Sequence, residues 1–168
     1  MISLDDLLHL GGEVHFTVIR GDITPEEEAS ILADDVDPEL EERIISRQVI
    51  HNLVTNTGRA GIATLMASGT TRPTYFAVGT SAITPAVADT TLTGELTRKA
   101  LSTSTTIATY FSRFAVTFTT GDFNNTVRGV ALFTAAAGGD MWTEASANVL
   151  KNASSTLVCD WRINVLTP

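Results

Sequence analysis

The chain has 168 residues, 43% hydrophobic and 18% charged, which is enough for one ordinary domain with its own core. That length excludes a large catalytic barrel and a dinucleotide-binding domain joined to a substrate domain. The net charge of −8 is uneven: residues 1–47 hold thirteen acidic side chains and three arginines, whereas residues 48–168 hold six acidic and eight basic ones.

This asymmetry predicts an acidic N-terminal arm, residues 1–47, joined to a nearly neutral body, residues 48–168. Nucleic acid and anionic membranes repel an acidic surface, so we expect neither as a direct partner. A basic protein surface is the expected attractor, and the alternative is an acidic helix that only aids solubility.

The arm begins with a segment that Gly11 and Gly12 are expected to end. Residues 13–20 follow, with the sequence EVHFTVIR. Their apolar and polar side chains alternate with a period of two, which predicts a strand.

A helix start signal follows the strand. Thr24 stands before a proline, and Glu27 lies three residues after Thr24, which together make a capping box with proline at the first helical position. Glu26 and Glu28 add negative charge to the first turn, where the helix dipole favours it. We predict a short helix over residues 25–34.

The next segments alternate between strand and helix patterns. Residues 42–54, ERIISRQVIHNLV, predict a strand with imperfect alternation. Asn56 and Thr57 offer a cap to a short helix in the following segment, although Gly58 and Gly61 each weaken a helix by about 1 kcal/mol.

From Tyr75 onward nearly every pattern predicts strand. The expected strands are YFAVGT (75–80), ELTRKAL (95–101), one long strand over 105–120, VRGVALFT (127–134), MWTEAS (141–146) and TLVCDWRINVL (156–166). The 26 threonines suit pleated surfaces that water touches. The chain is therefore expected to be mainly β, an antiparallel β-sandwich of jelly-roll or immunoglobulin-like type, with an acidic arm and one or two short helices.

Patterns for catalysis, metals and cofactors are weak. The segment Gly79–Ala82 lacks the second glycine of a nucleophile elbow, and the three histidines have no zinc-site spacing. Asp160 lies on the polar face of its strand, where a surface ladder with Arg113 or Arg128 is expected instead of catalysis. Cys159 lies on the apolar face and is expected in the core. We therefore expect no enzyme activity, no metal and no cofactor.

The two tryptophans have different expected roles. Trp161 lies on the apolar face of its strand, which predicts a core position. Trp142 lies beside the loop AAAGGDM and is a candidate surface contact, for example with a sugar. No apolar run is long enough for a membrane-spanning helix.

Three segments resemble small virion structural proteins of tailed bacteriophages: NLVTNTGRAGIATLMASG, the AVGT strand with the loop that follows it, and GVALFTAAAGGDM. The resemblance covers residues 52–166 and leaves out the acidic arm. It implies a β-sandwich that packs into a virus particle as a head-decoration, tail or fibre-anchor module, with no catalytic residues to carry over.

These observations predict a capsid decoration or cement protein that is assembled in the bacterial cytoplasm and resides in the virion. The partners would be the major capsid protein, or tail or collar proteins, and a homo-oligomer is expected, with a trimer as the working guess. The expected partner-binding residues of the arm are Phe16, Val18, Glu26, Glu27, Glu28, Ile44 and Ile45. The alternatives are a tail, collar or baseplate component, a fibre-anchoring adaptor and, in another class, a host-glycan-binding module.

Overall fold

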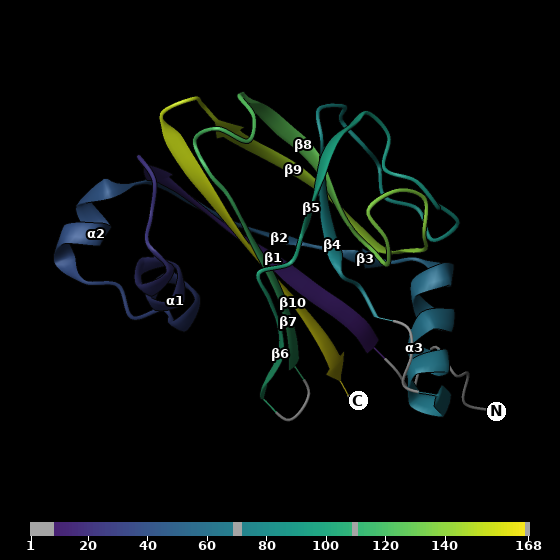
Figure 1. The fold of residues 1–168 in the computed structure, drawn as a ribbon. Coiled ribbons are helices and arrows are strands. Elements are labelled where there is room, and N and C mark those ends of the chain that lie inside the picture. The colour runs from purple at the N-terminus through teal and green to yellow at the C-terminus, as the bar shows by residue number, and fades with distance from the viewer. Residues whose placement is uncertain (1–8, 69–71, 109–110, 167–168) are drawn as a thin grey trace.

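Two five-stranded antiparallel sheets pack face to face in the computed structural model, which describes residues 9–68, 72–108 and 111–166 (Figure 1). Sheet A contains, in spatial order, β2 (Ile44–His51), β1 (His9–Arg20), β10 (Ser155–Leu166), β7 (Phe111–Phe118) and β6 (Thr103–Ala108). Sheet B contains β3 (Leu53–Val54), β9 (Met141–Lys151), β8 (Asn125–Phe133), β4 (Tyr75–Gly79) and β5 (Glu95–Ala100). The predicted antiparallel β-sandwich is confirmed.

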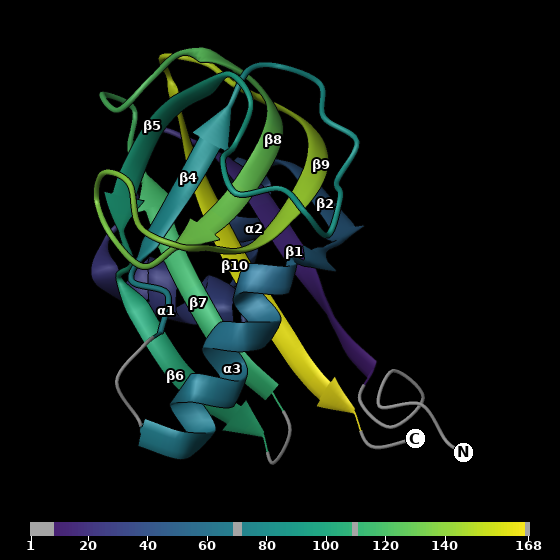
Figure 2. The ribbon, with the colours of Figure 1, turned by 90° about the vertical axis from the view of Figure 1, so that its right-hand side faces the viewer.

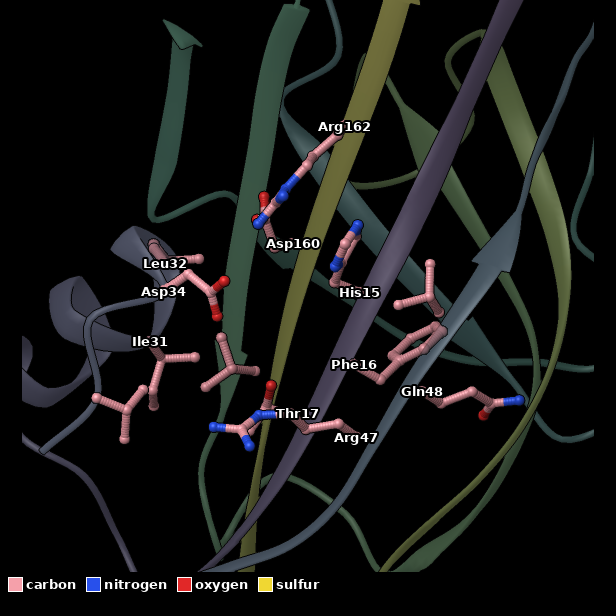
Figure 3. Close-up of a pocket in the computed structure, with 13 residues that line it drawn as sticks. His15, Phe16, Thr17, Ile31, Leu32, Asp34, Arg47, Gln48, Asp160 and Arg162 are labelled. Carbon is pink, nitrogen blue, oxygen red and sulfur yellow. The ribbon is translucent and has the colours of Figure 1, made fainter. Parts of the chain in front are cut away.

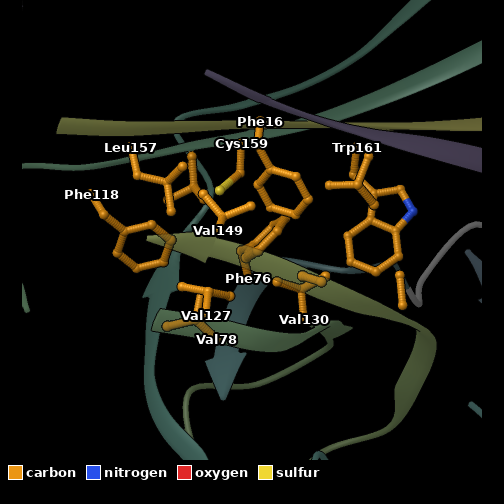
Figure 4. Packing of buried hydrophobic residues seen from close by; sticks show 14 of the residues in the cluster. Phe16, Phe76, Val78, Phe118, Val127, Val130, Val149, Leu157, Cys159 and Trp161 are labelled. Atoms are coloured by element: carbon orange, nitrogen blue, oxygen red, sulfur yellow. The ribbon is translucent and has the colours of Figure 1, made fainter. Parts of the chain in front are cut away.

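The core lies between the inner faces of the two sheets. In β10 the alternate residues Leu157, Cys159, Trp161 and Ile163 all point into it, as the period of two predicts. The ring of Phe76, from sheet B, meets the ring of Trp161 edge to face at 5.5 Å between centroids (Figure 4). Apolar packing between residues far apart in the sequence therefore stabilises the two sheets against each other.

Strand β1 is an interior strand of sheet A, although its residues belong to the predicted arm. It pairs antiparallel with β10 over its whole length and with β2 on its other side. The proposed division between an arm at 1–47 and a body at 48–168 is therefore not a division in space for residues 9–20. A strand with two neighbours and a buried face cannot act as a detachable arm.

Two short helices cover one end of the outer face of sheet A. The predicted capping box at Thr24 is present and starts α1 (Pro25–Ala33). Asp37 and Pro38 start α2 (Pro38–Arg43) in the same way, because the Asp37 side chain accepts from the Leu40 amide at 2.8 Å. Leu32 and Leu40 pack on the sheet against Ile19, Ala115 and Val158.

Helix α3 (Asn56–Ser68) lies on the side of sheet A that faces sheet B, next to the end of sheet B (Figure 2). Thr55 directly precedes it, and the Thr55 hydroxyl accepts from the Gly58 amide at 3.0 Å, so Thr55 and not Asn56 or Thr57 caps the helix. Gly58 and Gly61 face Trp142, where added Cβ atoms would lie 1.9 Å from its carbonyl oxygen and 2.5 Å from its ring. The two glycines weaken the helix but permit close packing.

Several predicted element boundaries were wrong. Residues 105–120 form two strands, β6 and β7, which pair antiparallel, with residues 109–110 outside the described part. Residues 42–54 divide into β2 and β3, and their first two residues belong to α2, a helix that was not predicted from the sequence. Gly11 and Gly12 lie inside β1 instead of ending a segment before it.

Candidate functional site

The structure separates the residues that the sequence singled out for partner binding. Phe16 and Val18 are 1% and 2% exposed, because both point from β1 into the core. Their prediction as directly accessible contacts is corrected. Ile44 packs partly buried beside the helices on the outer face of sheet A, whereas Ile45 is 51% exposed.

A groove of about 340 Å³ lies between β2 and β9, along one side of the sandwich. Phe16 and Val18 lie at its base, and Ile45 and Leu150 line it from the two strands. Leu150 is 62% exposed, the largest value among the exposed apolar side chains of the described residues. The groove thus brings together three of the predicted contact residues with a fourth, on β9, that sequence reasoning missed.

Both strands at the groove have an open edge. β2 is one of the two edge strands of sheet A. β3, an edge strand of sheet B, pairs with β9 only at Thr143 and Glu144. In the described part of the chain, residues 145–151 of β9 therefore have a strand neighbour on one side alone.

The flank of the groove is acidic. α2 runs directly into β2, and residues 34–43 contain six acidic side chains and one arginine. Glu39 and Glu42 are exposed, while Glu41 is paired with Arg47 of β2 at 2.6 Å. A basic segment approaching this edge would be attracted to it.

Glu26, Glu27 and Glu28 have mainly structural contacts. Glu27 completes the capping box and pairs with Arg43, and Glu28 accepts a hydrogen bond from Ser102 at 2.7 Å. Glu26 is exposed. The first turn of α1 therefore ties the helix to the body and leaves one of the three carboxylates open to solvent.

Asp160 lies under α1, at the centre of the outer face of sheet A (Figure 3). It is 4% exposed and accepts hydrogen bonds from Arg113 Nε at 2.9 Å and from Arg162 Nε at 2.8 Å. Arg113 also donates to the Leu32 carbonyl of α1 at 2.6 Å. The predicted pairing with Arg113 is confirmed, but it is a buried cluster and not a surface ladder, because α1 covers it.

The cavity beside this cluster has a volume of only about 80 Å³. It has room for water but not for an organic substrate, since ligand pockets span roughly 300–1,000 Å³. The cluster therefore fixes α1 to the sheet.

Trp142 is not a surface contact. It is 3% exposed and packs against the glycine face of α3. Its backbone carbonyl accepts from the Thr55 amide at 3.0 Å. The proposed role of Trp142 in binding a sugar is corrected, because the side chain lies between β9 and α3.

Glu144 is a second buried carboxyl group. It is 2% exposed, and its Oε1 accepts from the Ala86 amide at 2.9 Å. Asp89 accepts from the same amide at 3.0 Å. Burial, and then the neighbouring Asp89 carboxyl, raise the pKa of Glu144 to about 7.

Two further findings concern ligands and membranes. Within residues 9–68, 72–108 and 111–166, no three His, Cys, Asp or Glu side chains gather as metal ligands would. No helix in the same ranges has the length and apolar character that crossing a bilayer requires.

Comparisons with protein-family models, curated proteins and solved structures give no match to this chain.

Proposed function

We propose that this protein is a structural component of a bacteriophage particle, and specifically a capsid decoration or cement protein that binds the assembled shell. The observation that supports this most directly is the groove between β2 and β9, where Ile45 and Leu150 are both more than half exposed. Apolar side chains beside open strand edges are typical of surfaces that a partner covers. The resemblance of residues 52–166 to small virion proteins indicates the class of partner.

The docking segment of the partner is extended and basic. An extended segment can add to an open strand edge through main-chain hydrogen bonds, with Ile45 and Leu150 contacting its apolar side chains. The acidic flank at Glu39 and Glu42 favours lysine and arginine on that segment. The same flank disfavours a second copy of this chain at the groove, because two acidic flanks would then meet.

Binding to the assembled shell would stabilise it by mass action. A protein that binds the assembled state and not the separate subunits shifts the equilibrium towards assembly. The groove lies on two strands of the packed sandwich, so little conformational entropy is expected to be lost on docking. The role needs no catalytic residue and no cofactor.

The experiment compares phage particles with and without this protein. Particles purified from a phage that encodes the chain should contain it, with a copy number that matches the capsid lattice. Particles of a deletion strain should bind the purified protein when it is added back. Ile45→Asp and Leu150→Asp should each weaken that binding by roughly tenfold or more.

Leu96→Asp is the matched control. Leu96 is 43% exposed on β5, the edge strand on the opposite side of sheet B, and its change should leave binding intact. Equal loss with all three variants, or absence of the protein from purified particles, would overturn the proposal. A small copy number typical of a ring would instead favour a tail, collar or baseplate component.

A further inference from the structure

A hollow of about 540 Å³ opens on the outer face of sheet A, towards the end that α1 and α2 do not cover. At its base Gly11 of β1 is paired with Asn164 of β10, and Asn164 is paired with Phe111 of β7. Paired residues project from the same face of a sheet, so this row has a gap where Gly11 lacks a side chain. The volume lies within the range of small-ligand pockets.

The lining is apolar on one side and polar on the other. Phe111 and Ile107 come from the β6–β7 pair, and Ile107 is 39% exposed. Glu13, His51 and Arg162 provide the polar side. A ligand with one apolar surface and a polar rim would match this division.

The polar side both donates and accepts hydrogen bonds. Arg162 uses its Nε hydrogen for Asp160, and a guanidinium group has four further N–H donors. Glu13 Oε2 contacts His15 Nε2 at 3.1 Å, and Glu13 Oε1, which lies 4.0 Å from His51 Nδ1, is the acceptor left for a ligand. Asn164 Oδ1 is buried without any hydrogen-bond partner, so a donor reached by a small rotation of the amide would satisfy it.

The charges around the hollow nearly cancel. Glu13 stands opposite Arg162 in the β1–β10 register, and its carboxylate contacts His15 Nε2 at 3.1 Å. The buried Asp160 lies between Arg162 and Arg113. A balanced set of charges gives little net attraction for an anion or a cation. It suits a neutral ligand that makes many hydrogen bonds.

We propose that this hollow binds a neutral sugar residue of a glycan. A pyranose ring has an apolar C–H face for Phe111 and Ile107, and a rim of hydroxyl groups that donate and accept for Glu13, Asn164 and Arg162. This site would give the protein a second binding activity, on a different face from the groove between β2 and β9. It lies on sheet A, whereas Trp142, the contact expected from the sequence, is buried on sheet B.

The test is a titration of the ¹⁵N-labelled full chain with the methyl glycosides of glucose, galactose, mannose and N-acetylglucosamine. At least one glycoside should shift the amide signals of Gly11, Glu13 and Asn164 in a saturable way. Gly11→Leu should weaken that response roughly tenfold or more, because the new side chain fills the gap. A Cβ at Gly11 would have no heavy atom within 4 Å, so the first carbon of the new side chain meets no neighbour.

Gly121→Leu is the matched control, since a Cβ at Gly121 also has nothing within 4 Å and this residue lies between β7 and β8, away from the hollow. It should keep the full response. The proposal is overturned if no glycoside shifts these signals, or if the response persists in Gly11→Leu. A response to sodium acetate in place of the glycosides would also overturn it, by showing an anion site.

Discussion

Asp160 and Arg113 meet diagonally across the β10–β7 pair, with 2.9 Å between Asp160 Oδ1 and Arg113 Nε. The register places Arg113 directly opposite Arg162. The two guanidinium groups carry like charges directly across the strands and repel each other. The Asp160 carboxylate accepts a hydrogen bond from each of them and offsets this repulsion. One acidic side chain thus bridges two arginines on the outer face of sheet A.

Asp160→Asn should destabilise the protein by about 2–3 kcal/mol. Removing one member of a buried ion pair costs about 3–5 kcal/mol, and partial exposure of the arginines lowers that figure. Urea unfolding followed by circular dichroism measures the change. Asp140→Asn, in an exposed loop, should leave the unfolding midpoint unchanged, and equal effects would refute the role given to Asp160.

Gly61→Ala should also destabilise the protein, although alanine favours a helix by about 1 kcal/mol over glycine. The added Cβ would lie 2.5 Å from the ring of Trp142, and overpacking of this kind costs about 1–3 kcal/mol. The double variant Gly61→Ala, Trp142→Leu should lose less than the sum of the two single variants. Additive losses of stability would show that the methyl group added at position 61 does not clash with the Trp142 ring.

The sequence predicted those features that depend on local periodicity. The alternation around Trp161 gave both the strand and its buried face, and the residues after Thr24 gave the start of α1. Asp37 and Pro38 repeat the Thr24 signal, and this signal could have revealed α2.

Features that depend on distant pairing could not be predicted in the same way. The net charge of residues 1–47 suggested an arm, but β1 belongs to the core because Phe16 is paired with Cys159, far along the chain. Trp142 was expected on the surface because a loop precedes it, and only the packing of α3 shows that it is buried. The groove between β2 and β9 likewise depends on which strands lie at the sheet edges.

Lys151→Met should destabilise the protein by about 1–3 kcal/mol. Lys151 is 0% exposed, and its Nζ donates to the Phe123 carbonyl at 2.7 Å. Burial lowers the pKa of this amine. Methionine keeps the apolar stem but leaves the carbonyl without its donor.

Lys99→Met is the control variant for Lys151→Met. Thermal unfolding compares the melting temperatures of the two. Lys99 pairs with Asp122 at 2.7 Å, with both side chains partly exposed. Such a pair contributes up to about 1 kcal/mol, so Lys99→Met should lower the melting temperature less than Lys151→Met. The reverse order would contradict the importance given to the buried amine.

The buried carboxyl group of Glu144 should make the protein less stable as pH rises from about 5 to 8. Its pKa is raised from 4.5 in the unfolded chain to about 7 in the fold, so the folded state binds the extra proton. The stabilisation is complete below the unfolded value and is lost as pH rises through the folded one. The expected loss is roughly 2–3 kcal/mol, measured by urea unfolding across this range.

Glu144→Gln should flatten this pH dependence, because the amide oxygen can still accept from the Ala86 amide and its NH₂ group can donate to Asp89. All other titrating groups are shared with the unmodified protein, so the difference between the two curves isolates Glu144. Glu39→Gln, at an exposed position on α2, should keep the original slope. If Glu144→Gln retains that slope as well, the proton that stabilises the fold resides on another group.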